Sequence, residues 1–206
     1  MSDVSAIILA AGMAKRFTES GGVGASKLVA QLAGAPLVRH VANAALASQA
    51  RPILVVTGHA AQEVETALSG LALTFVFNSD YAAGLATSLR CGLAALPMGA
   101  TGALILLADM PEISAALLDR LIDAFGARPK ALAVAPIFHG QRGNPVLLSR
   151  ALFPQVAKLR GDEGARRLLA SAAKSDLVEI TADDDASTLD IDTIGALSDA
   201  RARFRR

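Results

Sequence analysis

The sequence predicts an α/β fold in which helices cover both faces of a mostly parallel central sheet. Short apolar runs alternate along the chain with segments of helical periodicity, which is the pattern of βα units. These runs are continuously apolar, as expected of strands that are buried on both faces. Hydrophobic residues make up 52% of the 206 residues, and no repeat or linker divides the chain, so we expect one domain over residues 1–206.

The apolar runs give the expected strands in chain order. The first is Ala6–Ala10, a run of Ala, Ile and Leu. The later strands are expected over Ile53–Thr57, Leu73–Phe77, Gly102–Leu107 and Leu132–Pro136. A turn-rich loop at 140–145 then leads into the short apolar run Val146–Leu148.

The helices between these strands carry their own start and stop signals. Pro36 suits a first helical turn and precedes a helix that carries Leu37 and Val41 on one face. Ser114 is expected to cap a further helix, which Gly126 can end. Two more helices are expected over 87–96 and 163–173, and the four arginines at 201, 203, 205 and 206 should cap a last helix.

Composition excludes several classes of function. The net charge of +1 provides no field that would attract nucleic acid, so we expect no nucleic-acid partner. Cys91 is the only cysteine, which rules out an internal disulfide and a cysteine-based zinc site. The N-terminus lacks the features of a signal peptide and no apolar run is long enough to span a bilayer, so we expect a cytoplasmic protein without membrane contact.

The loop after the first strand is a candidate phosphate-binding site. It runs from Gly12 to Lys27, contains small residues that let backbone amides approach an anion, and carries the cations Arg16 and Lys27. Because ligands of open α/β sheets bind at the carboxyl ends of strands, this position favours a ligand. The alternative is a surface loop with two solvated cations. The loop contains neither a Walker motif nor the glycine fingerprint of dinucleotide-binding folds.

A carboxylate follows another buried strand. Asp109 ends the run Ala103–Ala108, and Pro111 forces the chain to turn there. Mg²⁺ is usually held by one or two carboxylates together with substrate phosphates, so Asp109 is a candidate metal ligand. The alternative is an aspartate that caps the turn between Pro111 and Ser114.

A second acid is needed to complete such a site. Around Asp190 and Asp192, acidic and apolar residues alternate, which would place both carboxylates on one face of a short strand. The acidic run 183–185 is expected to be a solvated turn.

Taken together, these segments resemble the MobA-like nucleotidyltransferases. The resemblance rests on Leu9–Gly12 with Arg16 and Lys27, on the Ala-Asp-Met-Pro segment at Asp109, and on the late Asp-x-Asp-Thr segment at Asp192. It implies a three-layer α/β/α Rossmann-like nucleotidyltransferase fold. The Ala-Ala-Gly form resembles members that use CTP in place of GTP. Family members usually have only a few residues between the Arg and the Lys, whereas Phe17–Ser26 intervene here.

Three further stretches resemble the molybdenum cofactor cytidylyltransferases within this family. They are Asn78–Arg90, the Gly-Gln-Arg-Gly-Asn-Pro loop at 140–145, and the Gly-Asp-Glu-Gly-Ala-Arg turn at 161–166. Thr87 or Ser88 is expected to cap the helix that follows Asn78. The guanidinium groups of Arg142 and Arg166 suit a phosphorylated acceptor, and surface ion pairing with Asp162 or Glu163 is the alternative.

The resemblance assigns roles to individual residues. The residues implied in nucleotide binding are Leu9, Ala10, Ala11, Gly12, Arg16, Lys27, Asn78, Ser88 and Asp109. Those implied in acceptor binding are Arg142, Asn144, Asp162 and Arg166. Arg16, Lys27 and Asp109 are the implied catalytic residues. Asp109 and Asp192 are the implied ligands of Mg²⁺, and Asp190 is implied less directly.

The activity implied is transfer of a nucleotide from CTP to molybdenum-loaded molybdopterin, with release of pyrophosphate and a transient contact with a molybdoenzyme. Other acceptors stay open: molybdopterin with GTP, a methylerythritol phosphate, or a sugar phosphate. A non-catalytic protein that escorts the cofactor is a further alternative, although it would not need both Asp109 and Asp192. A dinucleotide-dependent dehydrogenase is weakened by the missing glycine fingerprint.

Overall fold

The protein is built around one sheet. The computed structural model describes residues 3–22, 24, 26–171 and 176–205, without the side chains of Arg166, Ala170 and Ser171. In these ranges eight strands form a sheet in the order β10-β7-β9-β6-β1-β4-β5, with β8 paired to β7, while β2 and β3 form a separate hairpin. The strands are β1 Val4–Ala10, β2 Gln31–Leu32, β3 Ala35–Pro36, β4 Ile53–Thr57, β5 Thr74–Phe77, β6 Gly102–Leu107, β7 Ala133–Phe138, β8 Gln141–Arg142, β9 Val146–Ser149 and β10 Leu177–Thr181.

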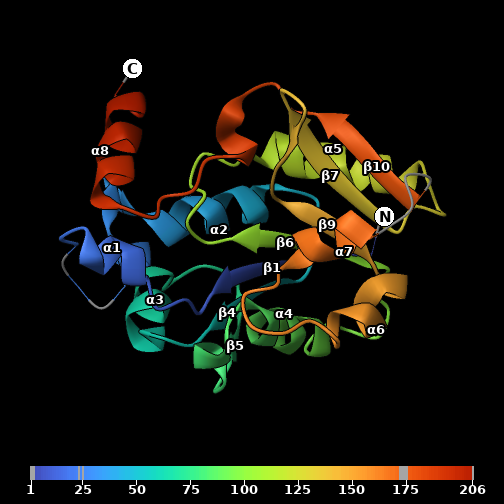
Figure 1. Ribbon diagram of the computed structural model, residues 1–206, viewed down its shortest axis with the longest axis horizontal. Coiled ribbons are helices and arrows are strands. Elements are labelled where there is room, and N and C mark those ends of the chain that lie inside the picture. The colour runs from blue at the N-terminus through green and yellow to red at the C-terminus, as the bar shows by residue number, and fades with distance from the viewer. Residues whose placement is uncertain (1–2, 23, 25, 172–175, 206) are drawn as a thin grey trace.

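The central strands run parallel, as the sequence predicts. β1 lies between β4 and β6 and pairs with both in parallel register, for example Ile8 with Val55 and Leu106. β9 runs antiparallel to both β6 and β7. Because β1, β4 and β6 share one direction, their carboxyl ends lie at the same edge of the sheet, where α1 and α8 are found (Figure 1).

Helices cover both faces of the sheet. In Figure 1, α2 lies above β1 and β6 and α4 lies below them. The core of α2 also contains residues of α5, and the core of α4 contains residues of α6, which gives the expected three layers. The helices are α1 Lys15–Glu19, α2 Leu37–Ala47, α3 Ala61–Ala67, α4 Leu85–Ala94, α5 Ala115–Gly126, α6 Phe153–Val156, α7 Ala165–Ser171 and α8 Ile194–Arg203. Within the described ranges, no helix has the length and apolar character needed to cross a membrane.

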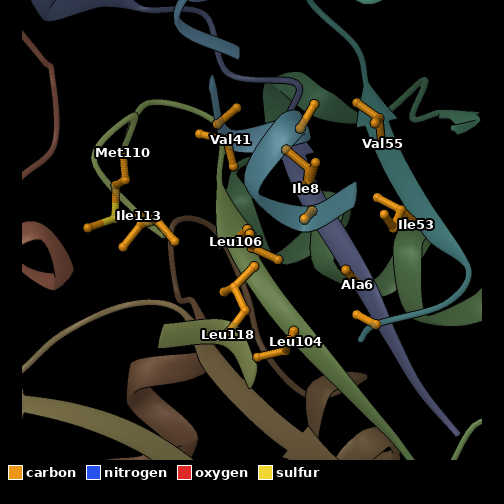
Figure 2. Close-up of a cluster of buried hydrophobic side chains, with 14 of the residues drawn as sticks. Ala6, Ile8, Val41, Ile53, Val55, Leu104, Leu106, Met110, Ile113 and Leu118 are labelled. Atoms are coloured by element: carbon orange, nitrogen blue, oxygen red, sulfur yellow. The ribbon is translucent and has the colours of Figure 1, made fainter. Parts of the chain in front are cut away.

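The alternation of strand side chains produces two cores. Ile8, Val55 and Leu106 face α2 and α5 and form the cluster shown in Figure 2. Their chain neighbours Ile7 and Val56 face the opposite way and pack in the layer of α4. All five side chains are buried. Burial of each such side chain contributes about 1.5–3 kcal/mol, so the centre of the sheet is a rigid base for the loops at its edge.

A third, smaller core lies beyond the edge of the sheet. It joins α1 and the β2–β3 hairpin to the C-terminal segment and α8. Its buried members are Phe17, Leu32, Leu37, Ile191, Leu197 and Ala200. The C-terminal part of the chain is thereby held next to the loop that follows β1.

Several local expectations were wrong in detail. The segment at Asp190–Asp192 is not a strand, and its residues lie in an extended connection before α8. Gly84 and not Thr87 or Ser88 is the N-cap of α4, and its cap has no side-chain hydrogen bond. Gly84 has a φ of 103°, a conformation that favours glycine. The helix therefore begins directly after this glycine, at Leu85, and not after Thr87 or Ser88.

Candidate active site

Asp109 lies at the carboxyl end of β6, at the edge of the sheet where β1 also ends. The strand pairing continues to Ala108, whose amide donates to the carbonyl of Leu9 over 3.2 Å. The turn that follows is anchored in the core by Met110 and Ile113, both visible in Figure 2. The carbonyl of Asp109 also accepts from the amide of Ile191 at 2.9 Å, which ties the C-terminal segment to this turn.

Lys27 meets two carboxylates that are far apart in the sequence. Its ammonium group lies 2.7 Å from Oδ2 of Asp109 and also contacts Oδ1 of Asp192. Lys27 belongs to a single 3-10 turn, Lys27–Val29, in which Leu28 is buried and Ser26 accepts from the amide of Leu28. This packing fixes the backbone from which the lysine side chain extends.

Arg16 completes a cluster of two cations and two acids. Its guanidinium lies 2.7 Å from Oδ2 of Asp192, and its side chain is 75% exposed. Burial disfavours the charged form of Asp192, but Lys27 and then Arg16 outweigh burial and lower the pKa of this carboxyl. Burial likewise opposes the charge of Lys27, yet Asp109 and Asp192 raise the pKa of the ammonium above its ordinary value. Both side chains are therefore charged at neutral pH.

The long insertion between Arg16 and Lys27 is compatible with this cluster. Phe17 is buried in the third core, and the hydroxyl of Ser20 accepts from the amide of Ile194 at 3.1 Å. Gly22 packs so tightly on Phe17 that a Cβ there would lie 2.2 Å from the ring. The described part of the insertion is thus packed against α8, and Lys27 still reaches the acids.

The acids fit a divalent cation. Oδ1 of Asp109 is buried and has no hydrogen-bond partner among the described residues, so one carboxylate oxygen is free to bind an ion. Carboxylate oxygens are the ligands that Mg²⁺ and Mn²⁺ prefer. No group of three or more His, Cys, Asp or Glu residues in the described ranges could hold a metal by itself. A metal at Asp109 and Asp192 would need further oxygens from a bound ligand, as Mg²⁺ in phosphate-transferring sites does.

Asp190 is a weaker candidate ligand. The pKa of its carboxyl is raised, first by burial and then by the negative charges of Asp192 and Asp109. Burial and the two neighbouring acids thus favour the neutral form of Asp190, whereas the pKa of Asp192 is lowered, so Asp192 is the better ligand for a cation.

A cavity of about 460 Å³ joins the charged cluster to the N-terminal end of α4. This volume lies within the range of about 300–1,000 Å³ that is typical of small-molecule sites. The residues expected in nucleotide binding that line it are Leu9, Ala11, Gly12, Arg16, Lys27, Ser88 and Asp109. Asp192 and Asp162 line it as well. Ala10 is buried in β1 behind the cavity.

Asn78 lies behind Ser88. Its side-chain amide donates to the hydroxyl oxygens of Thr87 at 2.9 Å and Ser88 at 3.0 Å, and it is buried. Thr87 donates its own proton to the carbonyls of Asp80 or Gly84. The proton of the Ser88 hydroxyl has no acceptor among the described residues, so Ser88 can donate to a ligand in the cavity.

The far wall of the cavity forms where two loops touch. The amide of Ala86 donates to the carbonyl of Gly161 at 3.0 Å, and a Cβ on Gly84 would lie 2.3 Å from the backbone of Gly161. Oδ1 of Asp162 accepts from the amide of Leu85 over 3.4 Å. Only glycine at position 84 permits this approach.

The other expected acceptor residues are placed differently. Arg142 donates to Glu179 at 2.5 Å, in an ion pair that spans β7 and does not line the cavity. The backbone N–H of Asn144 donates to the carbonyl of Ser187 at 2.7 Å, and Asn144 also lies outside the cavity lining. The side chain of Arg166 is outside the described part of the chain.

Other residues line the cavity that were not among the expected site residues. Met13, Lys15, Tyr81 and Gly161 are examples. Met13 and Lys15 lie between Gly12 and Arg16 in the first loop. They would have been predicted if the whole loop had been taken as the site. Tyr81 and Gly161 belong to stretches whose resemblance was noted, but only the fold shows that these stretches meet.

Comparison with known proteins identifies the class. A family model described as "MobA-like NTP transferase domain" matches residues 6–177. The chain belongs to this family, and its class is that of the nucleotidyltransferase enzymes. Among curated proteins it is similar to the purine catabolism protein PucB of Bacillus subtilis, with 42% identity over 96 residues that cover 47% of this chain and 45% of that protein. The chain thus matches less than half the length of the curated relatives named first, PucB and then the bifunctional protein GlmU.

Solved structures support the same class over the whole chain. A nucleotidyl transferase from Methanothermobacter thermautotroptrophicus superposes with a TM-score of 0.81 at 26% identity, covering 98% of both chains. Rv0371C of Mycobacterium tuberculosis H37Rv, in complex with manganese, superposes with a TM-score of 0.77 at 26% identity, covering 97% of this chain and 98% of that one. The divalent metal in the second structure agrees with metal use in this family.

Proposed function

We propose that this protein is a Mg²⁺-dependent cytidylyltransferase that transfers CMP from CTP to molybdenum-loaded molybdopterin and releases pyrophosphate. The observation that carries the proposal is the meeting of Arg16 and Lys27 with Asp109 and Asp192 at one end of a single cavity. Such an arrangement combines cations for a triphosphate with acids for a metal. An escort protein without chemistry would have no use for the acids.

The reaction needs positioning and charge neutralisation more than a strong base. A phosphate oxygen of the acceptor attacks the α-phosphorus of CTP, the bond to the β-phosphate breaks, and the electron pair leaves with pyrophosphate. The attacking phosphate is already anionic, so no proton has to be removed from it. Arg16 and Lys27 stabilise the charge that develops on the leaving group. Asp109 and Asp192 would hold Mg²⁺, which would supply further neutralisation of phosphate charge.

We place the cytosine base at the other end of the cavity. The hydroxyl of Ser88 can donate a hydrogen bond to a ligand in the cavity. O2 and N3 of cytosine can accept this hydrogen bond if the base lies at the N-terminal end of α4. The small residues Ala11 and Gly12 leave room for the nucleotide along the first loop. The Ala-Ala-Gly sequence, which resembles CTP-using members of the family, supports the same choice.

The acceptor would enter near the loops at 140–145 and 161–166. Asp162 already lines the cavity, while Arg142 lies outside it with Glu179 as its partner. Asp162 contacts the N-terminal end of α4, where we place the base, so we place the acceptor outward of the base, between Asp162 and Arg142. Arg142 is assigned to the outer part of a long ligand such as molybdopterin.

A panel of nucleoside triphosphates tests this function. CTP, GTP, ATP and UTP are each supplied with Mg²⁺, and pyrophosphate is measured with and without molybdenum-loaded molybdopterin. Release only with CTP and this acceptor is expected. Parallel reactions contain a sugar 1-phosphate or a methylerythritol phosphate, and release with either would redirect the assignment of the acceptor. Binding of CTP without release of pyrophosphate in any reaction would favour an escort protein.

A further inference from the structure

The position of Lys27 has a consequence for how a metal reaches the site. Its ammonium lies between Asp109 and Asp192, and the three side chains are only 11%, 19% and 19% exposed. The two acids therefore already share a cation that the chain itself supplies.

The lysine engages the oxygens that a metal would need. Lys27 contacts Oδ2 of Asp109 and Oδ1 of Asp192, and Arg16 contacts Oδ2 of Asp192. Only Oδ1 of Asp109 has no partner among the described residues. A divalent ion arriving alone would meet one free carboxylate oxygen and two positive side chains, so its binding is opposed by Coulomb repulsion in a partly buried site.

A triphosphate offers Lys27 and Arg16 other partners. Both cations line the same cavity, so phosphate oxygens in it lie within reach of their side chains. The backbone of Lys27 is fixed by the buried Leu28, and the exchange of partners therefore requires only a movement of the lysine side chain. Arg16 is 75% exposed and can leave Asp192 at little cost in packing.

The geometry points to Lys27 as a positioning residue that holds Asp109 and Asp192 together and closes the metal position until a nucleoside triphosphate draws its ammonium away. The metal then enters with the nucleotide or after it. This inference rests on the proposed nucleotide and metal site, and it adds an order of binding. Because linkage is reciprocal, bound metal and bound triphosphate raise each other's affinity by the same factor.

The binding of Mn²⁺ to the free protein tests the inference without any turnover. Free Mn²⁺ is measured by electron paramagnetic resonance in the absence of nucleotide. Lys27→Met removes the charge and keeps an unbranched side chain, and its affinity for Mn²⁺ should exceed that of the wild type by roughly 10–100-fold, a range typical of coupling between two binding events. Lys27→Arg keeps the positive charge and should bind Mn²⁺ as weakly as the wild type.

Two controls locate the effect. Lys130→Met removes a lysine that is exposed in the turn after α5, and it should leave Mn²⁺ binding unchanged. The double variant Lys27→Met with Asp109→Asn should lose the gain, because the site would lack one of its acids. Equal Mn²⁺ affinity of the wild type and Lys27→Met would overturn the inference.

A second measurement uses the wild-type protein alone and does not depend on the folding of a variant. In protein with isotopically labelled lysine, the side-chain resonance of Lys27 should be unchanged by Mg²⁺ alone and should shift with CTP. A shift with Mg²⁺ alone would show that metal displaces the lysine without help, which contradicts the inference. Failure of calorimetry to detect any binding of CTP, with Mg²⁺ present, would instead count against the proposed function.

Discussion

The two halves of the sheet differ in how their functional side chains are arranged. After the roles proposed for them, we call β1, β4, β5, β6 and the loops at their carboxyl ends the nucleotide half, and β7 to β10 with the loops at 140–145 and 161–166 the acceptor half. In the nucleotide half, charged side chains from distant segments meet at one end of a cavity. In the acceptor half, Arg142 is engaged by Glu179 outside the cavity. Parallel strands bring their ends to one place, whereas loops depend on what they pack against.

The largest expected effect tests the nucleotide half. Asp109→Asn keeps the shape of the side chain but removes its negative charge, and it should lower the rate of pyrophosphate release by about 10²–10³-fold, by analogy with the loss of one electrostatic group from an active site. Steady-state assays with CTP, Mg²⁺ and acceptor measure this. Asp199→Asn removes an exposed acid on α8 and should leave the rate unchanged. A rate for Asp109→Asn within threefold of wild type would refute the metal assignment.

The same contrast explains how much of the structure could be predicted from the sequence. The strands Ile53–Thr57 and Gly102–Leu107 were placed with their observed bounds, because a continuously apolar run of this length has little choice but burial in a sheet. Asp109 could be predicted as a site residue because it comes directly after a buried apolar run. The segment at Asp192 was expected to be a strand, yet Ile191 is held in the third core and Asp192 points to Lys27 from an extended connection. An alternating pattern does not report such a tertiary contact.

The acceptor half was less predictable for the same reason. The residues Arg142 and Asp162 were expected to share a role, but the fold puts only Asp162 at the cavity. Its position depends on the close approach of Gly84 and Gly161, two glycines that are 77 residues apart. No local signal encodes that contact. The positive φ of Gly84 becomes informative only when the loop that packs against it is known.

The contact between the two halves can be tested with a pair of glycines. Gly84→Ala would place a Cβ 2.3 Å from the backbone of Gly161 at a φ of 103°, so the loops must separate. We expect a loss of about 1–3 kcal/mol in the free energy of unfolding. Thermal unfolding should shift downward by about 2–4 °C for each kcal/mol in a chain of this size. Nucleotide affinity should fall too, since the far wall of the cavity moves.

Gly12→Ala is the matched change in the first loop. A Cβ there would meet nothing within 4 Å, and the φ of Gly12 is not in the left-handed region, so thermal stability should be unchanged. The added methyl group would narrow the lining of the cavity where the nucleotide backbone is proposed to lie. Weaker CTP binding without loss of stability is therefore expected by calorimetry. Equal effects of the two alanine variants on stability would contradict the packing described here.

A smaller effect should follow from the loss of one hydrogen bond to the base. Ser88→Ala removes the only proton that Ser88 offers to the cavity. A neutral hydrogen bond of about 1 kcal/mol corresponds to roughly a fivefold loss of CTP affinity. Ser88→Thr keeps the hydroxyl and should retain most of the affinity. Asn78→Ala should weaken binding of CTP to a similar extent, because Asn78 orients the hydroxyl of Ser88 from behind. A ligand-independent role of Asn78 would instead lower thermal stability and leave CTP affinity unchanged.

The smallest expected effect concerns Arg142. It decides whether a charged side chain of the acceptor half contacts its ligand, as is proposed for the charged side chains of the nucleotide half. The ion pair with Glu179 joins side chains that are 38% and 36% exposed, and solvent screens such pairs. Arg142→Gln should therefore change the free energy of unfolding by no more than about 0.5 kcal/mol. It should leave CTP affinity unchanged, because Arg142 does not line the cavity.

If Arg142 releases Glu179 to bind the outer part of the acceptor, Arg142→Gln should raise KM for the acceptor a few-fold while kcat stays the same. Glu179→Gln frees the arginine and should lower that KM. An unchanged acceptor KM in both variants would make the pair purely structural and confine acceptor binding to the side of the cavity formed by Asp162.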